Sequence, residues 1–168
     1  NHQNTLKALN NLGRVQKSIG ELKLAEKNLL LALNGRTKVF GKRHADTIRS
    51  MNDIGELYVL QGKKEEALKI FRETLTLEEE VLGENHPYTF ETLNNLSRLL
   101  EKLGKIEEAY KVFKLGLILE TILKFDFEKV YVEGITAISV EDIQYAKELG
   151  YQIKHVGIIK NDGRLLEA

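Results

Sequence analysis

Residues 44–71 read HADTIRSMNDIGELYVLQGKKEEALKIF, and this stretch decides the fold. Its first half carries apolar side chains at spacings of three and four, which fall on one face of an α-helix: Met51, Ile54, Leu57 and Tyr58. Gly62 then supplies the positive φ angle that ends a helix and turns the chain. A second amphipathic helix is predicted from about Lys64 to Val81. The stretch therefore predicts a helical hairpin.

The same pattern returns every 42 residues along the chain. A shift by this offset superposes several sets of three identical residues: His2, His44 and His86; Asn10, Asn52 and Asn94; Gly20, Gly62 and Gly104; Ala25, Ala67 and Ala109. One hairpin cannot bury its apolar stripe alone, so such repeats must stack on their neighbours. We therefore predict a mainly α superhelix of three 42-residue repeats over residues 1–125.

The residues of the second repeat resemble the consensus of a known family. Ile54-Gly55, Tyr58, Gly62, Ala67 and Phe71 resemble the tetratricopeptide repeat. The longer period, with residues 82–89 and Leu93-Asn94-Asn95-Leu96, resembles the kinesin-light-chain type of that repeat. The resemblance implies a protein-interaction scaffold that binds a peptide segment of another protein along the concave face of the superhelix.

In such a superhelix the first helix of each repeat lines the concave groove. The predicted groove residues are the polar positions not needed for packing: Lys7, Asn10, Arg14 and Lys17; Arg49, Asn52 and Glu56; Glu91, Asn94, Arg98 and Lys102. An amide both donates and accepts hydrogen bonds, so the three equivalent asparagines would clamp an extended peptide backbone. In the family that the chain resembles, these asparagines hold peptide ligands. The alternative is that each asparagine bridges to the neighbouring repeat.

Four basic residues, Lys7, Arg14, Lys17 and Arg49, predict a positive charge in the early part of the groove. This charge favours a partly acidic peptide as the partner. The alternative is that these four side chains form an ordinary solvated helix face.

Composition and motifs exclude several other classes of function. Lys and Arg number 25, and so do Asp and Glu, which argues against a nucleic-acid partner. The chain has no cysteine, no apolar run long enough to span a membrane and no signal-peptide pattern, and we expect a cytoplasmic protein. The histidines that recur once per repeat are expected to be structural, so no metal site, cofactor or catalytic residue is predicted. Because the chain starts at Asn1 inside a repeat, we expect it to be a fragment.

The 42-residue period stops after Phe125, and residues 126–168 follow another pattern. Val130-Tyr131-Val132 predicts a strand, and Ser139 caps a predicted helix that ends at Gly150. Residues 151–160 alternate as in a strand, and Asn161-Asp162-Gly163 predicts a hairpin turn into a return strand. This order predicts a small β-α-β-β segment.

The same segment resembles a piece of bacterial homoserine dehydrogenase, in residues 130–135, 141–143 and 145–154. That family uses a nicotinamide cofactor to interconvert aspartate semialdehyde and homoserine. Its glycine-rich dinucleotide turn does not occur in this sequence. Lys114 lies upstream of this match at about the distance at which the family has its catalytic lysine. The family has an aspartate four positions before that lysine, and this chain has Tyr110 there. No active-site residue therefore carries over.

Two readings of the tail therefore stay open. In the first, the chain is a scaffold and the tail is a fusion, a recombined or mis-assembled gene product, or a cap on the last repeat. In the second, the chain is a fragment of a homoserine dehydrogenase-related enzyme fused to repeats, and it is inactive as it stands.

Overall fold

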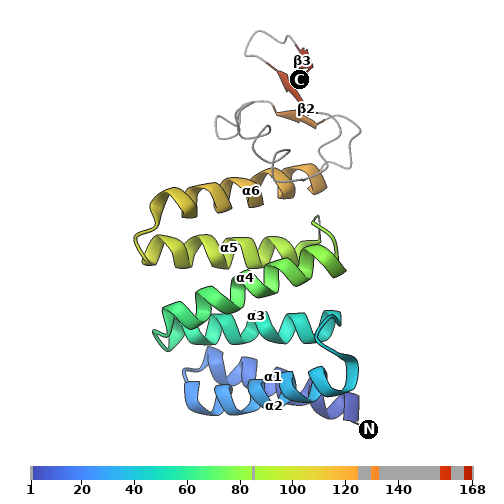
Figure 1. Ribbon diagram of the computed structural model, residues 1–168, viewed down its shortest axis with the longest axis vertical. Coiled ribbons are helices and arrows are strands. Elements are labelled where there is room, and N and C mark those ends of the chain that lie inside the picture. Colours follow the sequence, from blue (N-terminus) through green and yellow to red (C-terminus); the bar gives the residue numbers. More distant parts are fainter. Residues whose placement is uncertain (1, 85, 125–129, 133–155, 160–164, 168) are drawn as a thin grey trace.

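The computed structural model describes residues 2–84, 86–124, 130–132, 156–159 and 165–167, with side chains at 3–84 and 86–116. The repeat region consists of three helix pairs: α1 His2–Ser18 and α2 Leu22–Phe40; α3 Ala45–Leu60 and α4 Lys64–Val81; α5 Pro87–Lys102 and α6 Ile106–Lys124. Figure 1 shows the pairs stacked one on the next in chain order. The prediction of a mainly α stack of helical hairpins is confirmed.

The helix ends follow from residues that recur in each repeat. His44 precedes α3, and its Nδ1 accepts a hydrogen bond from the Asp46 backbone N–H at 3.2 Å; His86 does the same for Tyr88 before α5, also at 3.2 Å. These two histidines therefore act as N-caps, which satisfies a backbone donor that the helix leaves free. Gly62, after α3, has a φ angle of 76° and makes the predicted turn into α4.

Within a hairpin the two helices approach closely at a glycine. A Cβ atom on Gly55 of α3 would lie 2.5 Å from the Phe71 ring of α4, and one on Gly13 of α1 would lie 2.6 Å from Leu29 of α2. Neither distance is compatible with a real side chain. The glycines thus let a large apolar side chain of the second helix lie against the backbone of the first.

Neighbouring repeats are held together by one recurring apolar contact. Ala25 and Leu29 of α2 pack in one buried cluster with two residues of α3, Ile54 and Leu57. One repeat later the equivalent residues form the equivalent cluster: Ala67 and Phe71 of α4 with Leu96 and Leu99 of α5. All eight side chains are at most 3% exposed. Burial of each large member contributes roughly 1.5–3 kcal/mol, so this contact stabilises the stack.

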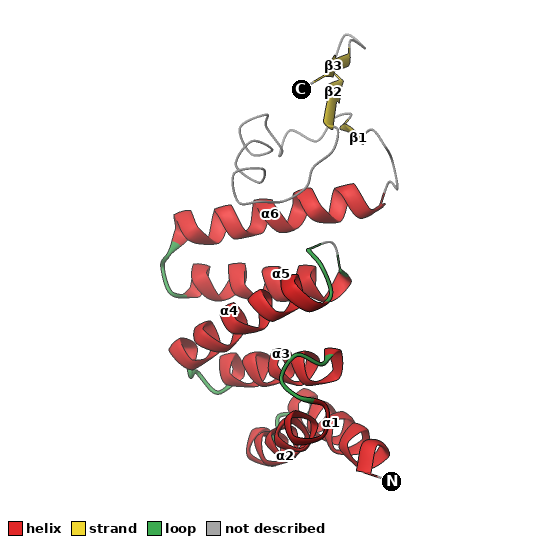
Figure 2. Cartoon of the chain, turned by 45° about the vertical axis from the view of Figure 1, so that its right-hand side comes forward, coloured by secondary structure: helices red, strands yellow, loops and turns green. Residues whose placement is uncertain are grey.

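Three short strands follow the helices in the chain: β1 Val130–Val132, β2 Val156–Ile159 and β3 Leu165–Glu167. Among the described residues, β1 pairs in parallel with β2, and β2 pairs antiparallel with β3 (Figure 2). The predicted helix at 140–149 and the predicted boundary at 125/126 lie outside the described residues. The complete β-α-β-β order therefore stays a prediction.

None of the helices in the described part of the chain combines the length and the apolar character that a membrane span needs.

Candidate functional site

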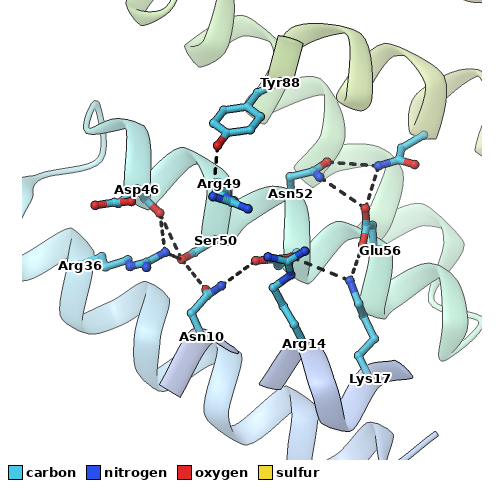
Figure 3. A network of polar contacts seen from close by, with 12 residues as sticks. Asn10, Arg14, Lys17, Arg36, Asp46, Arg49, Ser50, Asn52, Glu56 and Tyr88 are labelled. Atoms are coloured by element: carbon cyan, nitrogen blue, oxygen red, sulfur yellow. Dashed lines mark hydrogen bonds and ion pairs between the residues drawn. The ribbon is translucent and has the colours of Figure 1, made fainter. Parts of the chain in front are cut away.

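The first helices of the three repeats share one face of the stack. α1 contacts α3, and α3 contacts α5, in addition to the contacts inside each hairpin. We call the polar surface along α1, α3 and α5 the groove face; it carries the predicted binding residues 7, 10, 14, 17, 49, 52, 56, 91, 94, 98 and 102. Figure 3 shows that many of these side chains point toward one another across the helix boundaries.

Asn10 is buried at the boundary between the first and second repeats. It is 3% exposed, its amide donates a hydrogen bond to Asp53 Oδ2 at 2.8 Å, and its carbonyl oxygen accepts one from Ser50 Oγ at 2.9 Å. Both partners belong to α3 (Figure 3 shows Asn10 and Ser50). The amide therefore joins two repeats, which is the alternative that the sequence left open.

Asn52 makes the equivalent bridge one repeat later. It is 6% exposed, and its carbonyl oxygen accepts hydrogen bonds from Thr92 Oγ1 at 3.3 Å and Asn95 Nδ2 at 3.4 Å. The partners lie 40 and 43 residues after the asparagine, as Ser50 and Asp53 do after Asn10. Two of the three equivalent asparagines thus have partners within the protein, and neither presents a free amide to a ligand.

Asn94, the third of the equivalent asparagines, is exposed. The positions 40 and 43 residues after it are occupied by Gly134 and Ala137, which have no hydrogen-bonding side chain. Asn94 lines a cavity of about 440 Å³ with residues of α5 and α6, among them Arg98, Tyr110 and Phe113. Of the three predicted asparagines, this one is accessible.

Two of the four predicted groove cations are neutralised by acidic residues of α3. Arg14 Nε lies 3.4 Å from Asp53 Oδ1, and Lys17 forms an ion pair with Glu56. Burial raises the pKa of Asp53, and the hydrogen bond from Asn10 and the charges of Lys17 and Arg14 oppose that rise. The expectation that all four cations make the early groove positive is therefore too broad, because these pairs cancel much of the charge on Arg14 and Lys17.

The positive charge is concentrated instead in a pocket at the α1 end of the groove face. This pocket has a volume of about 280 Å³ and is lined by four basic residues, Lys7, Arg14, Arg36 and Arg49, together with Gln3, Asn4, Asn10, Asn11, Phe40 and Asp46. Lys7 and Arg49 are exposed, and the Arg49 guanidinium donates to the neutral Tyr88 hydroxyl at 3.1 Å. We call this site the basic pocket.

Arg36 contributes a buried charge to the basic pocket. It comes from α2 and is 6% exposed, and its Nη1 donates to the Asp46 carbonyl at 2.8 Å and to Ser50 Oγ at 2.7 Å. Burial lowers the pKa of the Arg36 guanidinium, but an arginine stays charged in a protein. Neither hydrogen-bond acceptor carries a negative charge, but the charges of Asp46 and Asp53 act on Arg36 and oppose the fall in its pKa.

The middle of the groove face is acidic. Glu56 accepts hydrogen bonds from Lys17 and, at 3.1 Å, from Asn95. Burial raises the pKa of the Glu91 carboxyl, and the nearby charges of Glu56 and Asp53 raise it further. Beyond this region, Arg98 and Lys102 are exposed on α5. The groove face therefore alternates from basic to acidic and back to basic along the stack.

The sequence prediction missed the residues that hold the groove face together. The bridging asparagines form hydrogen bonds with Ser50, Asp53, Thr92 and Asn95. Arg36 contributes a positive charge to the basic pocket. A signal for the first four existed, because a polar residue stands 40 and 43 positions after both Asn10 and Asn52. Arg36 had no such signal, since its repeat equivalent is Glu78, of opposite charge.

Within the described residues, no group of three or more His, Cys, Asp or Glu side chains is placed to hold a metal ion.

The C-terminal part of the chain is similar to a family of enzymes. The homoserine dehydrogenase family model matches residues 107–167. The homoserine dehydrogenase of Bacillus subtilis is 44% identical over 45 residues, and that of Neisseria gonorrhoeae is 43% identical over 42 residues. These matches cover 27% and 25% of this chain, and the chain spans only 10% of the length of each enzyme.

The helical part of the chain is similar to solved repeat structures. A Podosopora anserina protein described as a kinesin light chain with nearly identical TPR-like repeats superposes with a TM-score of 0.63 at 18% identity, over 68% of this chain and 55% of that one. BtubC (BKLC) from P. vanneervenii superposes with a TM-score of 0.65 at 16% identity, over 80% and 52%. The chain thus spans about half the length of these structures, and at such identities the likeness shows the fold.

The family model for the tetratricopeptide repeat matches residues 4–80 and 65–117, more than half of the chain. These ranges contain the groove face and both inter-repeat contacts. The chain belongs to the tetratricopeptide repeat family.

Proposed function

We propose that this protein is an interaction scaffold whose groove face binds an extended, partly acidic peptide segment of another protein. The basic pocket carries the proposal. Its lining holds four cations, Lys7, Arg14, Arg36 and Arg49, against one carboxylate, Asp46, and Arg36 is fixed in place by two hydrogen bonds. A peptide carboxylate would supply the missing negative charge.

The amides beside these cations support a peptide rather than a free anion as the ligand. Gln3, Asn4 and Asn11 are exposed and line the basic pocket, so they are available to donate to and accept from a peptide backbone. Asn94 and Arg98, exposed on α5, offer a second contact further along the groove face. The exposed carboxyl of Glu91 lies near Asp53 and Glu56, which are paired with Arg14 and Lys17. This acidic region disfavours a uniformly acidic ligand, so its acidic side chains should cluster at the end that enters the basic pocket.

The proposal is tested by fluorescence anisotropy with a labelled peptide that carries Asp and Glu at one end and neutral residues elsewhere. The matched peptide has Asn and Gln at the same positions. We expect the acidic peptide to bind more tightly and its affinity to fall as salt is added, because exposed charges are screened. Equal binding of the two peptides, or no binding of either, would contradict the proposal.

A pair of variants locates the site. In the double variant Lys7→Gln, Arg49→Gln the basic pocket loses its two exposed cations, and the affinity for the acidic peptide should fall at least about tenfold. The control is Lys27→Gln, Lys69→Gln, which removes the same charge from two exposed positions on α2 and α4. If the control weakens binding as much as the pocket variant does, the attraction comes from net charge and not from the basic pocket.

A second candidate function rests on the similarity of residues 107–167 to homoserine dehydrogenase. In this reading the chain is a piece of an enzyme-related protein, and residues 1–168 alone are inactive because the glycine-rich dinucleotide turn does not occur in them. Sequence on either side of residues 1–168 tests this reading. A glycine-rich βαβ unit there would favour an enzyme, and further 42-residue repeats would favour a scaffold.

A further inference from the structure

The basic pocket differs in charge from the equivalent place one repeat later. Its four cations have these residues 42 positions further along the chain: Arg49, Glu56, Glu78 and Glu91. Both places lie between two stacked repeats, and the same apolar contact packs both boundaries. The stack therefore forms with either sign of charge at these positions, and packing does not explain why the basic pocket has four cations.

The four cations reach the basic pocket from three helices, at the boundary between the first and second repeats. Helix α1 contributes Lys7 and Arg14, α2 contributes Arg36, and α3 contributes Arg49. Figure 3 shows the three arginines at this boundary. Their hydrogen bonds and ion pair run forward along the chain, to residues of α3 and α5: Asp46, Ser50, Asp53 and Tyr88. The pocket is thus formed by both sides of an internal boundary of the stack.

Arg36 is held in place before any ligand arrives. A guanidinium has five N–H donors, and the two hydrogen bonds of Arg36 to α3 both come from its Nη1. Its Nε and Nη2 form no hydrogen bond with another described residue. These two groups make a planar fork that matches two oxygens of one phosphate. Because the side chain is only 6% exposed and already fixed, little rotamer freedom is lost when it binds a ligand.

The charges of the lining favour a ligand with more than one negative charge. Four cations face one carboxylate, Asp46, which is an excess of three positive charges within the lining. From outside the lining, the carboxyls of Asp53 and Glu91 offset part of this excess. An aspartate or glutamate of a ligand brings one negative charge and two oxygens. A phosphate brings roughly two negative charges and three acceptor oxygens, so one group contacts several of the cations at once.

We propose that the basic pocket binds a phosphoryl group on a serine or threonine of the docked peptide. The inference rests on the proposed function and narrows it, because the partner docks best in its phosphorylated form. A single phosphate suits the groove face better than a chain of phosphates does. The acidic residues Asp53, Glu56 and Glu91 follow the basic pocket along the stack, and they repel the repeated charges of a nucleic acid.

The first test compares peptides by fluorescence anisotropy with the full chain. The peptide is the one-ended acidic peptide described above, and each position of its acidic end carries serine, glutamate or phosphoserine in turn. At one position or more, we expect phosphoserine to bind at least about tenfold more tightly than glutamate. If the glutamate peptides bind and phosphoserine adds nothing at any position, this proposal is overturned and the proposed function stands. If no peptide binds, both fall.

The second test assigns the preference for phosphoserine to the basic pocket. The ratio of the two dissociation constants, for the glutamate and the phosphoserine peptide, should fall at least about threefold in Lys7→Gln and in Arg36→Gln. Circular dichroism checks that the helices remain, and Lys7, which is exposed, decides the outcome if Arg36→Gln does not fold. The control is Lys27→Gln on the exposed surface of α2, which should keep the ratio of the wild type. An unchanged ratio in Lys7→Gln, or an equal fall in the control, overturns the proposal.

The third test separates a phosphopeptide from other sources of phosphate. Unlabelled competitors are added to the complex with the labelled phosphopeptide: the same peptide, inorganic phosphate and a single-stranded oligonucleotide. We expect the peptide to displace its labelled copy at a concentration at least about tenfold below either of the others, because only the peptide also contacts the rest of the groove face. Inorganic phosphate or the oligonucleotide displacing it equally well would overturn the proposal.

Discussion

Asn10 is expected to contribute more to the stability of the stack than its exposed neighbour Asn11 on the same helix. Its amide is a hydrogen-bond donor to the buried Asp53 carboxylate and an acceptor for Ser50. Asn10→Ala leaves both partners buried without these bonds, and we expect it to lower the free energy of unfolding by about 1–3 kcal/mol. Urea denaturation measures the change. Asn11→Ala, one residue further along and exposed, should be nearly neutral, and equal effects of the two substitutions would contradict the bridge.

Glu78 gives the repeat region a dependence on pH. Its side chain is 1% exposed on α4, and its Oε2 has no hydrogen-bond partner among the described residues. Burial raises the pKa of this carboxyl from 4.5 to about 8; a hydrogen bond with Thr92 opposes the rise, and the charges of Glu91 and Glu79 add to it. The folded state thus retains a proton that the unfolded chain releases above pH 4.5.

Stability should therefore fall as the pH rises from 4.5 to about 8 and then level off. Glu78→Gln removes this titration, so the variant should be more stable than the wild type above pH 8 and about equal to it near pH 4.5. Urea denaturation at a series of pH values measures the difference, with Glu65→Gln at an exposed position of the same helix as the control. A constant difference between Glu78→Gln and wild type across this range would refute the buried proton.

The residue scale also shows where sequence reasoning was limited. The repeat predicts equivalent positions for Asn10, Asn52 and Asn94, but the three side chains have different surroundings in the structure. Asn10 and Asn52 have a following repeat with polar partners, and Asn94 does not, so the first two are buried and the third is exposed. Arg36 could not be predicted because its role depends on Asp46 and Ser50 of the next repeat, which only the folded structure brings to it.

At the scale of single elements, substitution by alanine should change the free energy of unfolding in opposite directions at two glycines within helices. Gly55→Ala places a Cβ atom 2.5 Å from the Phe71 ring, and we expect a loss of roughly 1–3 kcal/mol in the free energy of unfolding. Gly116→Ala in α6 meets its nearest neighbour, Leu93, at 3.5 Å, an ordinary contact. This variant should gain up to about 1 kcal/mol from helix propensity. Thermal or urea denaturation checks both signs, and a stabilised Gly55→Ala would contradict the close helix crossing.

Elements were the most predictable level of this structure. α4 spans Lys64–Val81 as predicted, and α5 begins at Pro87, because apolar periodicity, glycine turns and an N-terminal proline are all local signals. The capping of α3 and α5 by histidine was not specified in advance. Histidine is not among the preferred N-cap residues, so the sequence indicated only that His44 and His86 are structural.

At the scale of the whole molecule, the stack is a one-dimensional array in which each repeat contacts its neighbours. The internal period predicted this architecture, since equivalent residues at 42-residue spacing require equivalent packing. The distribution of charge along the groove face was less predictable. The ion pairs of Arg14 and Lys17 with α3 cancel charges that look available in the sequence, so the positive charge of the early groove face is concentrated in the basic pocket.

The location of a bound peptide is the most direct test of binding by the groove face. Backbone amide chemical shifts of the 168-residue chain, followed by NMR during titration with the acidic peptide, report which residues it contacts. We predict that the largest changes fall on α1 and α3 around Lys7, Arg14 and Arg49, with smaller ones near Asn94 and Arg98. Changes centred on the outward positions of α2 and α4, such as Lys27 and Lys69, would contradict peptide binding by the groove face.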